Sequence, residues 1–292
     1  MRTNLRRTGA LALALTIFTV FAEKDKSYTY LALGDSIAFG FDPRVFVPGA
    51  PHPEPGSFVG YPELVVAGLP AGSTHINAAC PGKTSGSLII VGAPDNGCNG
   101  PGPQGQPPFK TSIGLHADYK KNRSQLEFAI HELQTNKSIK LVTLGIGGND
   151  LALLQARCST SVSGYADCVS DNLPTVLASY GSNLALLLRE LRERANYSGK
   201  LVLVTYYSPN ADQLTTGAIY LLNQTMASVG AQFGVTIADG FGAFQLASAG
   251  VSGDPCAAGL LIPLPAPPAC DIHPSESGRN LLARVIRGSL GW

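Results

Sequence analysis

Residues 28–36, Tyr-Thr-Tyr-Leu-Ala-Leu-Gly-Asp-Ser, decide the fold of this chain of 292 residues. The apolar run Tyr28–Leu33 has the length of a buried strand, and it stops at Gly34-Asp35-Ser36. A serine in a tight turn at the carboxyl end of a strand is exposed to the cleft, close to the start of a helix. Its N–H can then face a developing oxyanion. The alternative interpretation is helix capping, with Asp35 or Ser36 as the N-cap residue.

Strand and helix signals alternate along the rest of the chain. Further strands are predicted at His75–Ala79, Leu141–Ile146, Leu201–Tyr207 and Val235–Ala238. Helices are predicted at Tyr61–Leu69, Ser124–Leu133, Pro174–Arg194 (with Pro174 near its first turn), Thr216–Phe233 and Ser277–Arg287. This alternation predicts an α/β fold of three layers, α/β/α, around a central parallel sheet. Such sheets bind ligands beyond the carboxyl ends of their strands.

Two further motifs follow or precede these elements. Gly147–Asp150 comes directly after the predicted strand Leu141–Ile146, and the amide of Asn149 can donate to an oxyanion. Asp271–Pro274 precedes the last helix, and His273 in it can serve as a general base. The plainer alternatives are a strand-to-helix turn and a solvent-facing loop histidine. The remaining histidines are interpreted as surface or loop residues: His52, His75, His116 and His131.

Three stretches rich in proline and glycine interrupt the pattern, at Phe41–Gly60, Val91–Asn122 and Cys256–Cys270. Each is predicted to be an ordered surface loop. The first two loops carry apolar residues that suit an acyl chain: Phe41, Phe46, Val47, Phe58, Val91 and Phe109.

Composition limits the class of protein. A net charge of +1 provides no basic surplus for nucleic acid, and a hydrophobic share of 45% is enough for a large core. The N-terminus has arginines followed by the apolar run Gly9–Ala22, which predicts a signal peptide over residues 1–22 and secretion of a single domain, residues 23–292. An uncleaved membrane anchor is the alternative, but the run is short for a stable membrane span.

Six cysteines behind a signal peptide predict disulfides. Of the 15 possible pairings, sequence proximity favours Cys80–Cys98, Cys158–Cys168 and Cys256–Cys270. The alternative is zinc, but the chain has no C-x-x-C pair and its spacings fit no common zinc pattern, so no metal is expected.

In their order and combination, these motifs resemble the SGNH hydrolase (GDSL-like lipase/esterase) family. The matching blocks are Gly34-Asp35-Ser36, Asn77–Gly82, Gly147-x-Asn149-Asp150 and His273-Pro274, and the resemblance spans residues 28–291. The cysteines and the signal peptide are similar to those of the branch of secreted bacterial esterases and lipases with three disulfides. The resemblance implies a flavodoxin-like SGNH hydrolase fold.

The resemblance also implies roles for individual residues. Ser36 would form the acyl-enzyme, and His273 would be its general base. The oxyanion hole would comprise the N–H groups of Ser36 and Gly82 and the side chain of Asn149, with no cofactor. The family usually carries an aspartate three residues before the histidine. Here Cys270 has that place and Asp271 stands two before, so we expect the main-chain carbonyl of Cys270 to orient His273, with the Asp271 carboxylate as the alternative.

The predicted function is hydrolysis of carboxylic esters, with a small-molecule or lipid ester as substrate and a monomer as the working form. Two alternatives stay open: a carbohydrate O-deacetylase of the same fold and a secreted binding protein without turnover. The combined presence of Ser36, Gly82, Asn149 and His273 argues against the second.

Overall fold

A computed structural model describes most of the chain beyond the predicted signal peptide, in the ranges 26–45, 53–102, 105–119, 122–265 and 269–291. The predictions for residues 1–22, Phe46, Val47 and His52 fall outside these ranges.

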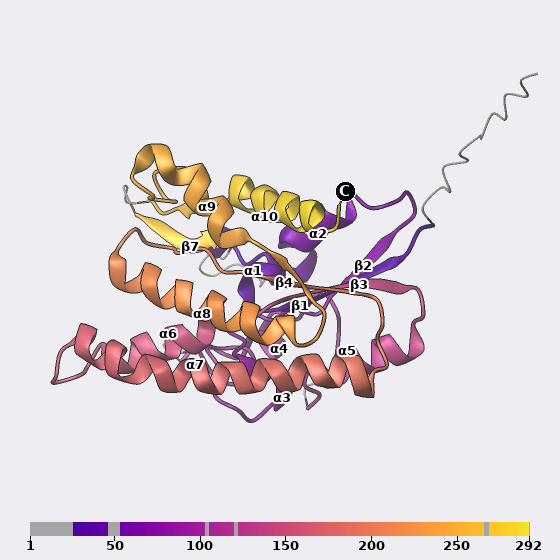
Figure 1. Ribbon diagram of the computed structural model, residues 1–292, viewed down its shortest axis with the longest axis horizontal. Helices are drawn as coiled ribbons and strands as arrows, with labels where there is room; N and C mark the ends of the chain where they lie inside the picture. Colours follow the sequence, from indigo (N-terminus) through magenta and orange to yellow (C-terminus); the bar gives the residue numbers. More distant parts are fainter. Residues whose placement is uncertain (1–25, 46–52, 103–104, 120–121, 266–268, 292) are drawn as a thin grey trace, which may run out of the picture.

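The centre of the molecule is a parallel sheet with the strand order β2-β1-β3-β4-β5 (Figure 1). Its strands are β1 Thr29–Gly34, β2 Thr74–Asn77, β3 Ile139–Gly145, β4 Lys200–Val204 and β5 Thr236–Ala238. Every residue of β1 is buried, as expected for a strand covered on both faces. The strand order is flavodoxin-like, as predicted, and its direction reverses between β1 and β3. Such a switch point is where doubly wound sheets bind their ligands.

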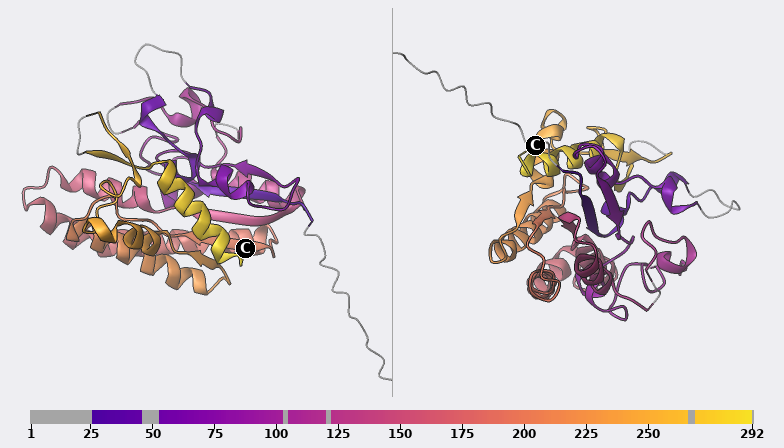
Figure 2. Two further views of the ribbon diagram at one scale, coloured as in Figure 1. Left: turned by 90° about the horizontal axis from the view of Figure 1, so that it is seen from above. Right: turned by 90° about the vertical axis from the view of Figure 1, so that its right-hand side faces the viewer.

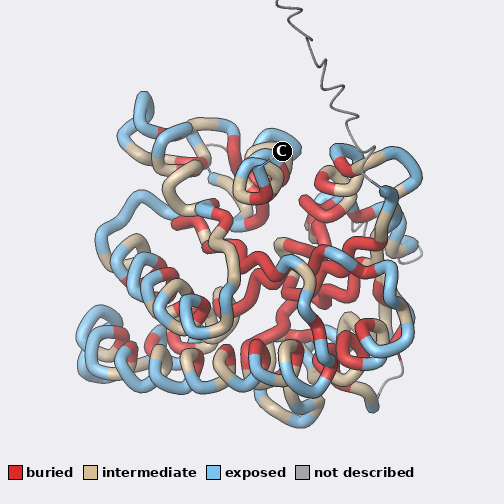
Figure 3. Tube along the Cα trace, turned by 45° about the vertical axis from the view of Figure 1, so that its right-hand side comes forward, coloured by how far each residue is buried: buried red, intermediate tan, exposed pale blue. Residues whose placement is uncertain are grey.

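Helices cover both faces of the sheet, which confirms the three-layer architecture (Figures 1 and 2). One face carries α2 Tyr61–Val66, α9 Gly240–Ser248 and α10 Glu276–Ser289. The other carries α3 Ser85–Ile89, α5 Gln125–Thr135, α6 Gly148–Cys158, α7 Tyr165–Arg189 and α8 Gln213–Ala231. Two short helices, α1 Ser36–Phe39 and α4 Phe109–Ser112, complete the set of described α-helices. Buried residues concentrate between the two helical layers (Figure 3).

Helix α7 begins earlier than the sequence predicted. It starts at Tyr165, so Pro174 stands inside the helix instead of in its first turn. The disulfide Cys158–Cys168 joins the end of α6 to the first turn of α7. The buried face of α7 continues on both sides of the proline: Val169, Leu173, Tyr180, Leu184, Leu187 and Leu188. Packing along this face outweighs the hydrogen bond that proline removes.

The predicted loop Cys256–Cys270 contains a strand, β6 Leu261–Pro263, which pairs antiparallel with β7 Cys270–Pro274. His273 therefore lies on a strand and not in a loop. The other two predicted loops contain only short helical turns in their described parts, at Pro43–Val45, Pro55–Ser57 and α4. Among the described helices, none combines the length and the apolar character that a membrane span requires.

All six cysteines are paired, and the pairing is the one that sequence proximity favoured. The bonds are Cys80–Cys98, Cys158–Cys168 and Cys256–Cys270, with sequence separations of 18, 10 and 14 residues. Each bond therefore closes a local loop.

Candidate active site

The turn after β1 places Ser36 at the switch point of the sheet. Gly34 has a φ of +145°, and a Cβ there would stand 2.3 Å from the Gly145 carbonyl oxygen of β3, so the turn requires glycine. Asp35 is the N-cap residue of α1, and its Oδ1 accepts from the N–H of Ile37 at 3.0 Å. Capping by Asp35 leaves Ser36 as the first residue of the helix.

Gly82 lies in a turn that a larger residue would strain. Its φ is +80°, and a Cβ would stand 2.3 Å from the carbonyl oxygen of Asn96. That same neighbour donates its N–H to the Gly82 carbonyl at 2.7 Å. Within the described part of the chain, the N–H groups of Gly82 and Ser36 have no recorded acceptor. Both remain available as donors.

Asn149, at the start of α6, connects the Ser36 turn to the Gly82 turn. Its Nδ2 donates to the Lys83 carbonyl at 3.1 Å and to Asp35 Oδ2 at 3.3 Å. Its Oδ1 accepts from Asn96 at 3.1 Å. Both N–H bonds of the Asn149 amide are thus engaged, so it can donate to an oxyanion only by releasing one of them, and the bond to Asp35 is the longer.

Asp150 fastens the segment beyond Gly82. The Asp150 carboxylate accepts from the N–H of Ser85 at 2.9 Å and from its hydroxyl at 2.6 Å, so it does more than form the strand-to-helix turn that was the plainer alternative. Asn183 of α7 donates to the same hydroxyl at 3.0 Å. The two glycine turns are therefore held by consecutive residues of one helix, Asn149 and Asp150.

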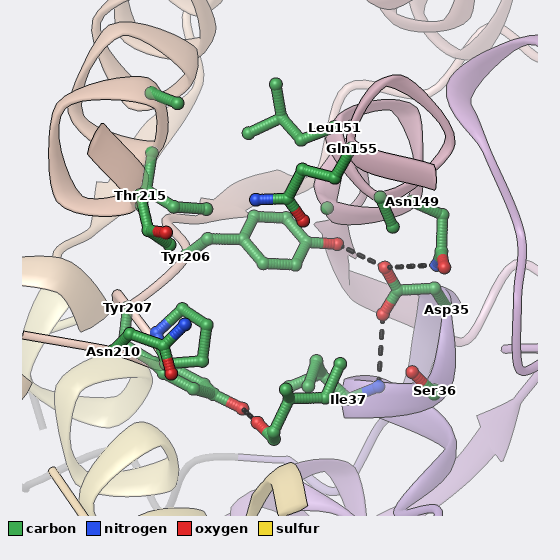
Figure 4. A pocket seen from close by; sticks show the side chains of 16 residues that line it. Asp35, Ser36, Ile37, Asn149, Leu151, Gln155, Tyr206, Tyr207, Asn210 and Thr215 are labelled. Atoms are coloured by element: carbon green, nitrogen blue, oxygen red, sulfur yellow. Dashed lines mark hydrogen bonds between the residues drawn. The ribbon is translucent and has the colours of Figure 1, made fainter. Parts of the chain in front are cut away.

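Asp35 is a buried carboxylate beside Ser36. Burial raises its pKa to about 6, although the hydroxyl of Tyr206, the N–H of Ile37 and the charge of His273 act in the opposite direction. The Tyr206 hydroxyl donates to Asp35 Oδ2 at 2.5 Å (Figure 4). No sequence motif marks Tyr206, which comes from the loop after β4.

At His273 the structure shows the contact that was given as the alternative, with the Asp271 carboxylate, and not the expected one with the Cys270 carbonyl. Nδ1 of His273 contacts Asp271 Oδ1, which also accepts from the His273 N–H at 3.0 Å. The strand explains this contact. Because residues two apart on a β-strand point to the same side, the side chains of Asp271 and His273 lie on the same face of β7. An ionised carboxylate accepts only, so the proton of this contact belongs to Nδ1.

Aromatic residues of the two long loops pack around His273. The ring of Phe41 lies 4.8 Å from the His273 ring, and also 5.4 Å from Phe109 and 6.2 Å from Phe58. These loop residues were expected to line an acyl pocket, but they form a cluster that leaves His273 only 8% exposed. In the described structure no hydrogen bond joins Ser36 to His273. In serine hydrolases, the hydrogen bond between nucleophile and base is often long before substrate binds.

A pocket of about 150 Å³ opens beside Ser36, between α6 and α8 (Figure 4). Its wall is mostly apolar. Its lining includes Leu151, Ala152 and Gln155 of α6, Ala218 and Ile219 of α8, Ile272 of β7, and Tyr206 and Tyr207 from the loop after β4.

The other described histidines take no part in this site. His75 lies on β2 and contacts Glu63 at 3.2 Å, and His116 bonds to the Phe39 carbonyl at 3.0 Å. Both are half-buried, whereas His131 is exposed on α5. No group of His, Cys, Asp or Glu side chains within the described ranges could hold a metal ion.

Comparison with known proteins identifies the family of the chain. A model of the GDSL-like Lipase/Acylhydrolase family matches residues 32–281, and the chain belongs to that family. No curated protein sequence matches the chain.

Solved structures show the same fold at low sequence identity. A phospholipase A1 from Streptomyces albidoflavus is 20% identical with a TM-score of 0.56, covering 90% of this chain and 100% of its own. An acetylxylan esterase from Geobacillus stearothermophilus is 16% identical with a TM-score of 0.56, covering 92% and 97%. A lipase from a goat rumen metagenome is 14% identical with a TM-score of 0.55, covering 90% and 97%. At these identities the similarity is one of fold.

Proposed function

We propose that this chain is a serine ester hydrolase that cleaves carboxylic esters through an acyl-enzyme on Ser36. The observation that carries the proposal is the convergence of three features at one switch point. These are the serine turn after β1, the donor turn at Gly82, and the Asp271–His273 pair on β7. This set supports the proposal because the three features would supply the nucleophile, the oxyanion donors, and the base with its orienting acid.

The proposed reaction follows from these positions. The Ser36 hydroxyl attacks the ester carbonyl while Nε2 of His273 takes its proton, and Asp271 stabilises the resulting imidazolium. The N–H groups of Ser36 and Gly82, joined by Asn149, bind the oxyanion of the tetrahedral intermediate. His273 then protonates the departing alkoxide. Water attacks the acyl-Ser36 ester by the same route in reverse, which releases the acid and restores the free hydroxyl.

The pocket favours an aliphatic acyl group over an acetyl group. A cavity of about 150 Å³ accommodates a molecule as large as benzene, so the pocket has room for an acyl chain of about four to six carbons. Ala152 of α6 and Ala218 of α8 are among the small residues of its wall. An acetyl group, the leaving acid of a sugar O-deacetylase, would fill only part of this space.

A panel of nitrophenyl esters from acetate to dodecanoate, with acetylated xylan beside it, tests the proposal. We expect a maximum of kcat/KM near butyrate to hexanoate and no turnover by Ser36→Ala. Ala152→Phe should lower kcat/KM for hexanoate by about tenfold or more while sparing acetate, because it fills the pocket. Ala156→Phe, one turn further along α6 on its exposed face, is the matched control. Substantial turnover by Ser36→Ala would refute the nucleophile, and a preference for acetylated xylan would make the protein a deacetylase.

We further propose secretion as a monomer after removal of residues 1–22. Three disulfides suit an oxidising compartment, which supports this assignment. N-terminal sequencing of the exported protein should begin at Glu23, and size-exclusion chromatography with light scattering should return a mass close to that of one chain.

A further inference from the structure

Two adjacent tyrosines follow β4 and enter the site from the same loop. The sequence predicted a strand as far as Tyr207, but β4 ends at Val204. The reason is Asn223 of α8, whose Oδ1 accepts from the Tyr206 N–H at 2.9 Å and whose Nδ2 donates to the Tyr206 carbonyl at 2.7 Å. Asn223 is only 6% exposed. Its amide therefore takes the place of a neighbouring strand and fixes the main chain of Tyr206.

The Tyr206 side chain extends to the turn after β1 that carries Asp35 and Ser36. Its hydroxyl donates to Asp35 Oδ2 at 2.5 Å, next to Ser36 (Figure 4). Its ring lies against Gly148, where a Cβ would stand 2.7 Å from Cε1 of the tyrosine. The glycine at position 148 thus leaves room for the Tyr206 ring to reach Asp35.

The Tyr207 side chain extends to β7, the strand that carries His273. Its hydroxyl donates to the carbonyl oxygen of Ile272, the residue between Asp271 and His273, at 2.7 Å. Its ring stacks on Phe244 of α9 with centroids 4.1 Å apart and planes 11° from parallel. The side chain is buried, so the ring and its hydroxyl have one well-defined position.

We propose that Tyr206 and Tyr207 are positioning residues that set the separation of Ser36 and His273. We call the pair the tyrosine brace, and its assignment rests on the function proposed above. The need for a brace follows from the topology: Ser36 follows the central sheet, whereas His273 lies on β7 of a separate sheet of two strands. One dipeptide, anchored on α8 by Asn223, bonds to the residue before Ser36 and to the residue before His273.

The hydrogen bond from Tyr206 also lowers the pKa of Asp35. It opposes the effect of burial, which favours the protonated acid. The other titratable groups that face Asp35 come from β7, α6, α7, α2 and the same loop: His273, Asp150, Tyr180, Tyr61 and Tyr207.

Removal of the two hydroxyls tests the brace. We expect kcat to fall by about 10- to 100-fold in Tyr206→Phe and in Tyr207→Phe, with KM changed by less than about twofold, because a misplaced catalytic group slows the chemical step. Tyr197→Phe is the matched control: this buried tyrosine donates to the Lys200 carbonyl at 3.1 Å, at the amino end of β4, opposite to the site. Values of kcat equal to that of the control would overturn the proposal.

A second readout does not depend on turnover. In the ¹H NMR spectrum, the Nδ1 proton of His273 bonded to Asp271 should appear downfield in the wild type and in Tyr197→Phe. It should be exchange-broadened in Tyr207→Phe, because the strand is no longer held. An unchanged signal in Tyr207→Phe would overturn the brace. If no ester is hydrolysed by the wild type, the proposed function fails, and the NMR result alone decides the brace.

Discussion

Replacing Asp271 with asparagine isolates the charge of the proposed catalytic acid. One oxygen, Oδ1, accepts from both the Nδ1 and the main-chain N–H of His273. An amide oxygen can occupy the same place, so Asp271→Asn can keep both hydrogen bonds and loses the negative charge. Burial raises the pKa of Asp271, but its hydrogen bonds and the charge of His273 outweigh burial and hold that pKa below the usual value. The wild-type carboxylate is therefore ionised throughout the neutral range.

The size of the effect follows from Coulomb's law. His273 becomes positively charged in the transition state, and two charges about 4 Å apart interact by about 4 kcal/mol at an effective dielectric constant of about 20. Because the Asp271 side chain is 24% exposed, solvent screens part of this interaction. With about 1.4 kcal/mol for each factor of ten, we expect kcat to fall by about 10²- to 10³-fold. An orienting carbonyl of Cys270 would instead limit the loss to about tenfold, since only a nearby charge would be removed.

The assay is hydrolysis of nitrophenyl butyrate by purified variants between pH 6 and 9, with Ser36→Ala as the background. Asp212→Asn is the matched control, because Asp212 caps α8 in an exposed position and asparagine caps equally well. A loss of tenfold or less in folded Asp271→Asn would refute the triad and restore the Cys270 carbonyl as the orienting group.

Further predictions concern the donors, the buried acid and the disulfides. Gly82→Ala should lower kcat by about 10²-fold or more in a protein with an unchanged circular dichroism spectrum. The added Cβ would stand 2.3 Å from the Asn96 carbonyl oxygen, and the strain would displace the N–H of residue 82. A variant with the kcat of the wild type would remove Gly82 from the oxyanion hole. Asn149→Ala should lower kcat by about 10²- to 10³-fold with little change in KM; a change in KM alone would make Asn149 a ground-state contact. Because the pKa of Asp35 is raised to about 6 in the folded state, Asp35 stays protonated between about pH 4 and pH 6, where the unfolded chain has lost this proton. The contribution of Asp35 to the free energy of unfolding therefore falls as the pH rises from about 4 to about 6. Urea unfolding at both pH values should show that Asp35→Asn lacks this component, and equal pH dependence in the two proteins would contradict it. Reduction should lower stability by about 2–5 kcal/mol per disulfide lost, and melting temperatures that are equal with and without reductant would contradict this.

The fold was predictable because its signals are local. The run Tyr28–Leu33 and the glycine that follows it identify β1, and the same kind of signal identifies β3 before Gly147. Alternation of these runs with helical periodicity is enough to predict a parallel sheet covered on both faces. The disulfides were predictable for the same reason, since each partner is the next cysteine along the chain.

The site was predictable only as far as its motifs extend. The orientation of His273 depends on whether residues 270–274 form a strand, and that pairing with β6 arises from tertiary structure across a long loop. Tyr206 carries no motif, since its role arises from a contact with Asp35, 171 positions away in the chain. The start of α7 before Pro174 likewise depends on packing against α6 and α8, which outweighs a local signal to stop.

The anchoring of Tyr206 by Asn223 has a consequence for producing the protein in eukaryotic cells. Asn223-Gln224-Thr225 is an acceptor sequence for N-linked glycans, but in the folded protein the Asn223 amide is buried, and its oxygen and its nitrogen bond to the main-chain N–H and carbonyl of Tyr206. An oligosaccharide transferred to this nitrogen before folding would replace one of those bonds and occupy space inside the molecule. A glycan at Asn223 would therefore identify chains that were glycosylated before α8 packed. For the same reason, Asn223→Gln would remove the glycan acceptor but would also disturb the two hydrogen bonds to Tyr206.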